Sequence, residues 1–222
     1  MGRLTRREFL KIAGTGAAGS ALVCGCASRL SPMVSSSNSP LAGEPTSIHA
    51  EALEPSMYIP DRVAYICECK PNIHNPGGGG NSSLFIGNYC SKSERFLLHW
   101  DLSGLPAGVK ISKAIIRLYC KEIYGHPSGR LIYAPLNSTW GNDVTYNSQP
   151  ENDPNGQIIM EWPGKGKWQE VEISDLVHQW LTTPETNFGL IGYAVDISEE
   201  TCSAVFSSIQ VPEGEKLILS IS

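Results

Sequence analysis

The sequence predicts an all-β domain of two sheets packed face to face, with one short helix. Three observations support this prediction. The apolar segments of the 222-residue chain are short and rich in Ile, Val, Tyr and Phe. Turn residues, drawn from 22 Gly and 15 Pro, divide these segments at intervals of about 8 to 12 residues, which is typical of β-sandwiches and barrels. About ten such segments exceed one small sheet, so two packed sheets are the economical arrangement.

The predicted strands follow one another with few interruptions. The longest covers 113–124, where Ala114, Ile116, Leu118 and Cys120 share one face because side chains alternate along a strand. That face is expected to lie in the core. The other strands are predicted over 62–69, 83–89, 95–103, 130–136, 143–147, 157–162, 168–173, 189–197, 203–208 and 216–222.

One segment, at about 174–182, has helical periodicity instead. Ser174 or Asp175 is suited to cap its first turn, and Pro184 prevents its continuation. An apolar stripe follows from the helical spacing of Leu176, Val177, Trp180 and Leu181. We expect this helix to close one end of the two packed sheets.

The first 26 residues have the pattern of an export signal. Arg6 and Arg7 precede an uncharged, Ala- and Gly-rich stretch over 12–23 that is too short and too weakly apolar to span a membrane. The order Thr-Arg-Arg-Glu-Phe-Leu-Lys resembles the twin-arginine motif, whose pathway carries folded proteins. The following Val-Cys-Gly-Cys resembles a bacterial lipobox, in which Cys26 fits the lipidated position better than Cys24.

We therefore expect an exported lipoprotein of the cell envelope. Its lipid would hold it on the outer face of the cytoplasmic membrane or on the cell surface, and would be its only contact with the membrane. Residues 27–55 are rich in Ser and Pro and poor in large apolar residues, so they are expected to form a disordered tether. Residues 56–222 then form one folded domain, a length sufficient for a full core.

Charge limits the partners of this domain. The first 26 residues hold four basic residues and one acidic residue, which leaves 13 basic and 21 acidic residues and a net charge of −8 over residues 27–222. An acidic domain without a basic run argues against nucleic acid and against anionic lipid headgroups as ligands. It suits a neutral ligand, or an anionic one held through a local basic pocket or a bridging cation.

Seven sequence blocks recur in an order shared with one known family. They are SLFIG, ERFLLHWDLSGLP, SKAIIRLYC, STWGNDVTYNSQP, VEISDLVHQWL, NFGLIGY and AVFSSI. Over residues 58–222 the chain resembles the DNRLRE domain family, which is similar to carbohydrate-binding module family 96 and to disaggregatase-related domains. His99 and Trp100 depart from that family's pattern, since a basic residue and Phe are usual there.

The resemblance implies a jelly-roll-like β-sandwich found in secreted and surface proteins, often beside polysaccharide-active enzymes. It also implies that polysaccharide or a cell-envelope glycan is the partner. We therefore expect a surface-anchored, non-catalytic binding module. A structural or adhesion protein that packs against a surface layer or a partner surface protein is the alternative, and a polysaccharide lyase is a third hypothesis.

Aromatic residues are the candidates for glycan binding, because pyranose C–H groups pack against aromatic faces. Trp162 lies in a turn-rich loop, and Tyr89, Tyr124 and Tyr146 are the other candidates for a stacking platform. The remaining tryptophans of the domain are expected to pack in the core, because the family pattern places aromatic residues that build the sandwich. These are Trp100, Trp140, Trp168 and Trp180.

The segment after the longest strand holds the ingredients of lyase chemistry. A lyase uses Tyr or His to remove a proton beside a uronate carboxylate, and Arg or Lys to neutralise that carboxylate. Tyr124, His126 and Arg130 supply these groups, with Lys121 nearby. A solvated hairpin explains the same residues, so Arg130 is retained as a binding residue and no catalytic residue is assigned.

The cysteines and hard oxygen ligands leave the metal state open. The predicted domain has five cysteines, of which Cys67 and Cys69 point the same way on a strand and diverge too far to bond each other easily. Zinc shared with His74 and Cys90, disulfides, and buried free thiols such as Cys120 or Cys202 all remain possible. No cofactor is expected beyond a possible structural calcium ion. Its candidate ligands are Asp61, Asn72, Asn75, Asn81, Asp101, Asn142 and Asp143.

Overall fold

A computed structural model describes residues 56–75, 82–106 and 108–222. The predicted signal, including Arg6, Arg7 and Cys26, and the predicted tether lie outside these residues. Within them, no helix is long and apolar enough to cross a membrane.

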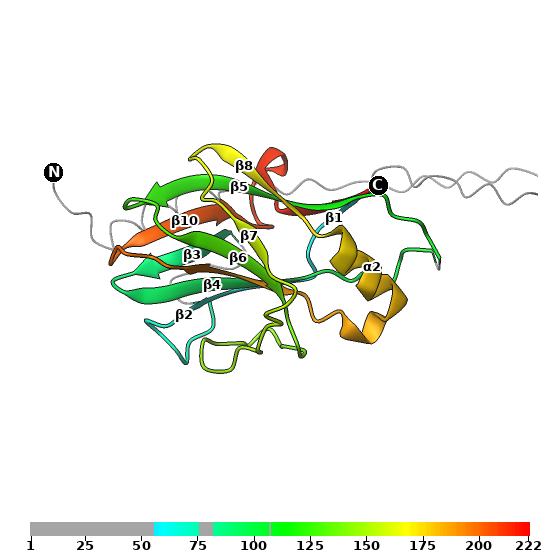
Figure 1. Cartoon of the computed structure of the whole chain (residues 1–222), viewed down its shortest axis with the longest axis horizontal. Helices are drawn as coiled ribbons and strands as arrows, with labels where there is room; N and C mark the ends of the chain where they lie inside the picture. Colours follow the sequence, from blue (N-terminus) through cyan, green and yellow to red (C-terminus); the bar gives the residue numbers. More distant parts are fainter. Residues whose placement is uncertain (1–55, 76–81, 107) are drawn as a thin grey trace, which may run out of the picture. The chain divides into compact units, whose positions relative to one another are not determined.

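The all-β class predicted from the sequence is confirmed. Among the described residues, eleven strands pair antiparallel, and one short α-helix accompanies two 3-10 turns (Figure 1). The strands are β1 (Ser56–Tyr58), β2 (Arg62–Cys67), β3 (Ser83–Tyr89), β4 (Lys92–His99), β5 (Ala114–Tyr124), β6 (Arg130–Pro135), β7 (Ile158–Met160), β8 (Lys167–Glu172), β9 (Leu190–Val195), β10 (Cys202–Ser207) and β11 (Ile218–Ile221). The helix is α2 (Ser174–Thr182), and the 3-10 turns are η1 (Pro184–Thr186) and η2 (Glu213–Glu215).

Hydrogen bonds connect all the strands, so the division into two separate sheets is not confirmed. The order is β1-β11-β5-β10-β3-β4-β9-β6-β7, with β2 added to β4 and β8 added to β5. Two strands change neighbours along their length. The same edge of β4 pairs with β3 up to Glu94 and with β9 from Phe96 onward. One edge of β5 likewise pairs with β11 and then with β10.

The sheet curves so that strands far apart in this order share one core. On β6, Tyr133 donates its hydroxyl hydrogen to Gln169 on β8 at 2.6 Å, and both side chains are buried. Phe96 on β4 packs edge-on against Phe206 on β10, with ring centroids 6.3 Å apart. The main core therefore spans β3, β4, β5, β6, β8, β10 and β11.

A smaller core lies on the other side of β4, β6 and β9. The long segment 136–157 packs over this side and contributes Trp140 and Val144. Trp140 is anchored there because its indole N–H donates to the Phe188 carbonyl at 3.0 Å. The strand predicted over 143–147 is wrong, because turns occupy these residues.

The helix has the predicted bounds, and it lies at one end of the strands (Figure 1). Val177 and Trp180 on its apolar stripe are buried. The predicted side-chain cap is wrong, because Ile173 occupies the N-cap position and no side-chain cap forms. Ser174 instead accepts the backbone N–H of Ala114 at 3.0 Å and thereby ties the helix start to β5.

Cys67 and Cys69 form a disulfide, with their Cα atoms 5.2 Å apart, which corrects the expectation that they diverge. That expectation placed both residues on one strand. The strand β2 ends at Cys67, and a turn closed by the Lys70 N–H and the Cys67 carbonyl brings Cys69 back. The zinc hypothesis that used both thiolates is therefore wrong. Cys90 is an exposed thiol, while Cys120 and Cys202 are buried.

Several of the oxygen ligands predicted for calcium serve as turn and loop acceptors, and Asn81 lies outside the described residues. Asn75 accepts the Tyr65 N–H at 2.7 Å, and Asp101 accepts the Ser103 N–H at 2.9 Å. Asn72 accepts the Asn147 amide at 2.8 Å. In the part of the chain that the structure describes, no group of three or more His, Cys, Asp or Glu side chains could hold a metal ion.

Candidate functional site

The structure places the five residues predicted to bind a ligand on several different elements. Trp162 is half-buried against the main core, and its indole N–H donates to the Ser128 carbonyl at 2.9 Å. Arg130 pairs with Asp196 at 3.0 Å. Tyr124 lies at the end of β5, where burial and then the nearby Glu122 raise its pKa to about 12.

Tyr89 and Tyr146 are the other two predicted binding residues. Tyr89 ends β3 and pairs with Lys92 across a tight turn. Tyr146 belongs to segment 136–157 and lies under the guanidinium of Arg95. Each of these aromatic side chains is half-buried, and the contacts of Trp162 and Tyr146 tie their rings to neighbouring segments of the fold.

The outer side of β5 and β8 carries an adjacent pair of half-buried aromatic residues, which the sequence interpretation missed. Tyr119 and Trp168 are register partners on these two strands, and their ring centroids lie 5.3 Å apart. The guanidinium of Arg117 lies 4.9 Å from the Trp168 ring. We call this surface the Trp168 face, defined by Arg117, Tyr119, Lys121, Trp168, Glu170 and Glu172.

Trp168 corrects a prediction, since it was expected in the core. The core prediction is confirmed for Trp100, Trp140 and Trp180, which are 0%, 5% and 2% exposed. Trp168 instead alternates with Gln169 and Val171, whose buried side chains point inward. The sequence contained this signal, because Glu170 and Glu172 share the parity of Trp168 and mark the outward side of β8.

The cations of the Trp168 face have partners. Arg117 donates from Nε to Glu170 at 3.0 Å, in a pair whose two side chains are 38% and 53% exposed. Lys121 donates to the Ser83 hydroxyl at 3.1 Å. Burial lowers the pKa of Lys121, while the negative charge of Glu215 acts in the opposite direction.

A second face lies on the outer side of β4 and β9, and we call it the Arg95 face. It is defined by Arg95, Tyr146, Gln149 and Tyr193. The Arg95 guanidinium lies 5.0 Å from the ring centroid of Tyr146 and 5.5 Å from that of Tyr193. Its N–H groups donate to Gln149 at 3.2 Å and to Ser93 at 3.0 Å. None of the ion pairs in the described residues includes Arg95.

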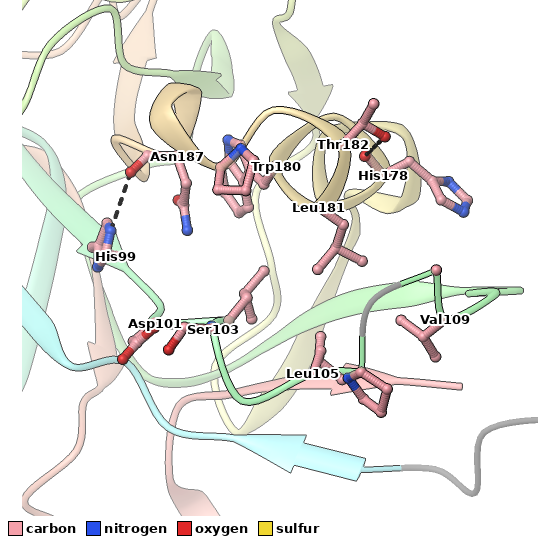
Figure 2. Close-up of a pocket in the computed structure, with 14 residues that line it drawn as sticks. His99, Asp101, Ser103, Leu105, Val109, His178, Trp180, Leu181, Thr182 and Asn187 are labelled. Carbon is pink, nitrogen blue, oxygen red and sulfur yellow. Dashed lines mark hydrogen bonds between the residues drawn. The ribbon is translucent and has the colours of Figure 1, made fainter.

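A pocket of about 610 Å³ lies between the segment after β4 and α2 (Figure 2). Leu105, Val109 and Leu181 give it an apolar wall. Figure 2 shows His99 and Asn187 at one end, joined by a 3.2 Å hydrogen bond from His99 Nε2 to the Asn187 carbonyl.

The polar groups at that end of the pocket serve the fold. His99 Nδ1 lies 2.6 Å from the Asp61 carboxylate, so His99 links the start of β2 to the segment after η1. The Asn187 amide donates to the Trp100 carbonyl at 2.9 Å, while Asn187 Oδ1 is buried without a partner in the described structure. Trp180 also lines the pocket, but at 2% exposure it offers no open ring to a sugar.

An antiparallel β domain with aromatic rings on open sheet faces is typical of the non-catalytic carbohydrate-binding modules. Comparison with known families places the protein within that class. The chain belongs to carbohydrate-binding module family 96, whose sequence profile matches residues 73–219. No curated protein shows a significant match to the chain. The matched range includes both the Trp168 face and the Arg95 face, so the family assignment alone does not choose between them.

Proposed function

We propose that the protein is an exported lipoprotein of the cell envelope that binds polysaccharide through its Trp168 face. Membership of family 96 supports non-catalytic carbohydrate binding. The observation that selects the face is the Tyr119–Trp168 pair, whose rings lie side by side on the outward side of β5 and β8 with polar neighbours. The proposal that the protein is exported and lipidated is supported by the sequence alone, through Arg6, Arg7 and Cys26.

Stacking and hydrogen bonding would act together on this face. A pyranose ring presents C–H groups that pack against an aromatic surface, and Tyr and Trp contribute large contact areas at low entropy cost. Glu170 accepts hydrogen bonds and Arg117 donates them, so the two flank the rings with groups of both kinds that sugar hydroxyls can use. A few polar groups beside an aromatic surface are the usual composition of a small-molecule site.

The lyase hypothesis has little structural support. The guanidinium of Arg130 is paired with Asp196, which leaves it less available to neutralise a uronate. The raised pKa of Tyr124 makes its phenolate, the form that removes a proton, harder to reach. The structural or adhesion role remains the alternative to glycan binding, and a partner surface protein would then occupy the same open face.

The test is retention on a panel of insoluble polysaccharides, run with and without calcium, with the purified full chain. We expect one class of polymer to retain the protein, and Trp168→Ala to release it. Trp162→Ala is the matched control, because Trp162 is tied to the Ser128 carbonyl away from the face. Retention lost in Trp162→Ala but kept in Trp168→Ala would overturn the assigned face. No retention on any polymer would favour the adhesion role.

Export has a separate test. Replacing Arg6 and Arg7 by Lys is expected to leave the protein in the cytoplasm if the twin-arginine pathway carries it. Cys26→Ala is expected to remove a mass corresponding to the lipid and to release the protein from membranes. Cys24→Ala is the control for the lipid site, and an effect equal to that of Cys26→Ala would contradict the assignment.

A further inference from the structure

We infer that the Cys67–Cys69 disulfide is a redox-active site that oxidises low-molecular-weight thiols, which attack it at Cys69. The site lies where β2 ends and the chain leaves the sheet. It belongs neither to the Trp168 face nor to the Arg95 face. The inference therefore goes beyond the proposed function and does not depend on it.

The first argument is that the two sulfur atoms differ in access. Cys67 is the last residue of β2 and is 0% exposed, whereas Cys69 lies in the following turn and is half-exposed. The rate of thiol–disulfide exchange depends on which sulfur a thiolate can reach. An external thiol therefore meets the Sγ atom of Cys69 first, and Cys67 is the group that leaves.

The second argument is that the structure stabilises Cys67 as a leaving group. The backbone N–H of Cys69 donates to Cys67 Sγ at 3.1 Å. A donor of this kind favours the thiolate form, and a thiol with a more stable thiolate leaves faster. The intervening Glu68 does not oppose this charge as an unpaired carboxylate would, because it binds Lys92 at 3.0 Å and the Ser93 N–H at 3.1 Å.

The third argument is that the turn is held without the sulfur atoms. The Glu68 N–H donates to the Ser93 carbonyl at 2.9 Å, and the Lys70 N–H donates to the Cys67 carbonyl at 3.0 Å. The disulfide itself closes a very short loop, since its cysteines are two positions apart, and a short loop stabilises a fold little. The reduced form therefore keeps its fold and holds the two thiols close enough to bond again.

The reaction consumes two external thiols for each disulfide. The thiolate of the first attacks Cys69 Sγ, the bond between the two Sγ atoms breaks, and its electron pair leaves with Cys67, which takes up a proton. The thiolate of the second attacks the external sulfur of the mixed disulfide and releases Cys69, which also takes up a proton. The products are the protein dithiol and the disulfide of the external thiol, and the reverse steps restore the Cys67–Cys69 bond.

The experiment exposes the oxidised full chain to reduced glutathione without denaturant, blocks free thiols with iodoacetamide, and maps the blocked cysteines by mass spectrometry. We expect Cys67 and Cys69 to become blocked together once glutathione is present. Cys120 and Cys202 are internal controls, because both are free thiols at 0% exposure. They should stay unblocked. A pair that resists glutathione, or that reacts only when Cys120 and Cys202 react too, would overturn the inference.

Two serine variants test the direction of attack. Treated with glutathione disulfide, Cys67→Ser should form a mixed disulfide at the half-exposed Cys69, and Cys69→Ser should lose that adduct because Cys67 is buried. Both variants also carry Cys90→Ser, since Cys90 is an exposed thiol that would compete. Equal or reversed adduct formation would overturn attack at Cys69.

The unaltered chain gives an independent answer if a variant does not fold. A short exposure to reduced glutathione, stopped with acid, should trap the mixed disulfide at Cys69. Finding it at Cys67 instead would overturn the direction of attack.

This inference and the proposed function fail separately. Trp168→Ala should be reduced by glutathione as readily as the unaltered chain, and the double variant Cys67→Ser with Cys69→Ser should be retained on polysaccharide as before. A reactive disulfide in a chain that binds no polysaccharide would contradict only the proposed function. An inert disulfide in a chain that binds polysaccharide would contradict only this inference.

Discussion

The Trp168 face and the Arg95 face are built from the same ingredients, an arginine and two aromatic rings, yet they differ in what neutralises the arginine. Arg117 has a carboxylate 3.0 Å away, and its side chain remains 38% exposed. Arg95 is held by a glutamine, a serine and the faces of two tyrosines. One surface is thus polar and balanced in charge, while the other keeps a positive charge inside an aromatic clamp.

This difference shows that composition alone does not define a carbohydrate surface. Tyr146 was predicted as a platform residue, but its ring packs against Arg95 and helps to fix segment 136–157 on β4. Tyr119 and Trp168 instead lie side by side on two regular strands. A ring used to hold a loop is less available to a ligand than a ring that projects from a rigid strand.

The largest effect is expected for the stability contribution of Arg95. Arg95→Ala removes two cation–π contacts and two hydrogen bonds from a half-buried site, and should lower the free energy of unfolding by about 2 kcal/mol. Arg117→Ala, on the more exposed face, should lower it by less than about 1 kcal/mol. Urea unfolding followed by fluorescence measures both. Equal losses would mean that the two arginines have the same structural role.

Polysaccharide affinity should respond differently to the loss of Tyr119 and to the loss of Tyr193. Tyr119→Ala is expected to weaken polysaccharide affinity about tenfold, which corresponds to about 1.4 kcal/mol, because it removes half of the ring pair on the Trp168 face. Tyr193→Ala on the Arg95 face is expected to leave that affinity unchanged. Isothermal titration against a soluble glycan compares the two. The reverse pattern would exchange the roles of the faces.

A smaller effect is expected from the ion pair between Arg117 and Glu170. A double-mutant cycle with Arg117→Ala and Glu170→Ala should give a coupling energy of about 0.5 kcal/mol, because both side chains are exposed to solvent. The coupling should decrease as salt is raised from low to about 1 M, since the Debye length falls to about 3 Å. A coupling that does not respond to salt would argue against an electrostatic origin.

The smallest effect concerns Glu68, beside the Arg95 face. The Ser93 N–H, followed by Lys92, lowers the pKa of this carboxyl below its ordinary value of 4.5. A carboxyl with a lowered folded-state pKa stabilises the fold above its unfolded-state pKa, and this stabilisation is lost as pH falls through the lowered value. Glu68→Gln should therefore cost a few tenths of a kcal/mol at pH 7, and nothing at a pH below the lowered pKa. A cost that persists in acid would contradict this linkage.

Regular periodicity explains which parts of the fold could be predicted. The alternation over 113–124 correctly identified the buried face of β5, and the helical spacing fixed α2 at Ser174–Thr182. The continuity of the sheet could not be predicted, because it depends on β4 and β5 changing partners along their edges. The Cys67–Cys69 disulfide was missed for a related reason, since the end of β2 depends on a local turn.

The candidate site was harder to predict than the fold. The sequence analysis predicted Trp162, in a turn-rich loop, as a ligand-binding residue, and it assigned the other tryptophans of the domain to the core. Trp168 is outside the core because its even-numbered position on β8 faces outward, whereas the odd-numbered Gln169 and Val171 face inward. The outward orientation of Trp168 could be predicted from the alternation of residues along β8. The position of Tyr119 beside it could not, because that position depends on the register between β5 and β8.

The pairing of β1 with β11 has a consequence for the order in which this protein matures. Ser56 pairs with Ile221, so the first strand of the described domain finds its partner only when translation has passed through the entire domain. The sheet can therefore be completed only after the whole domain has been synthesised. Folds rich in such distant contacts also form slowly. A route that waits for a finished cargo, as the twin-arginine pathway proposed here does, matches this requirement of the topology.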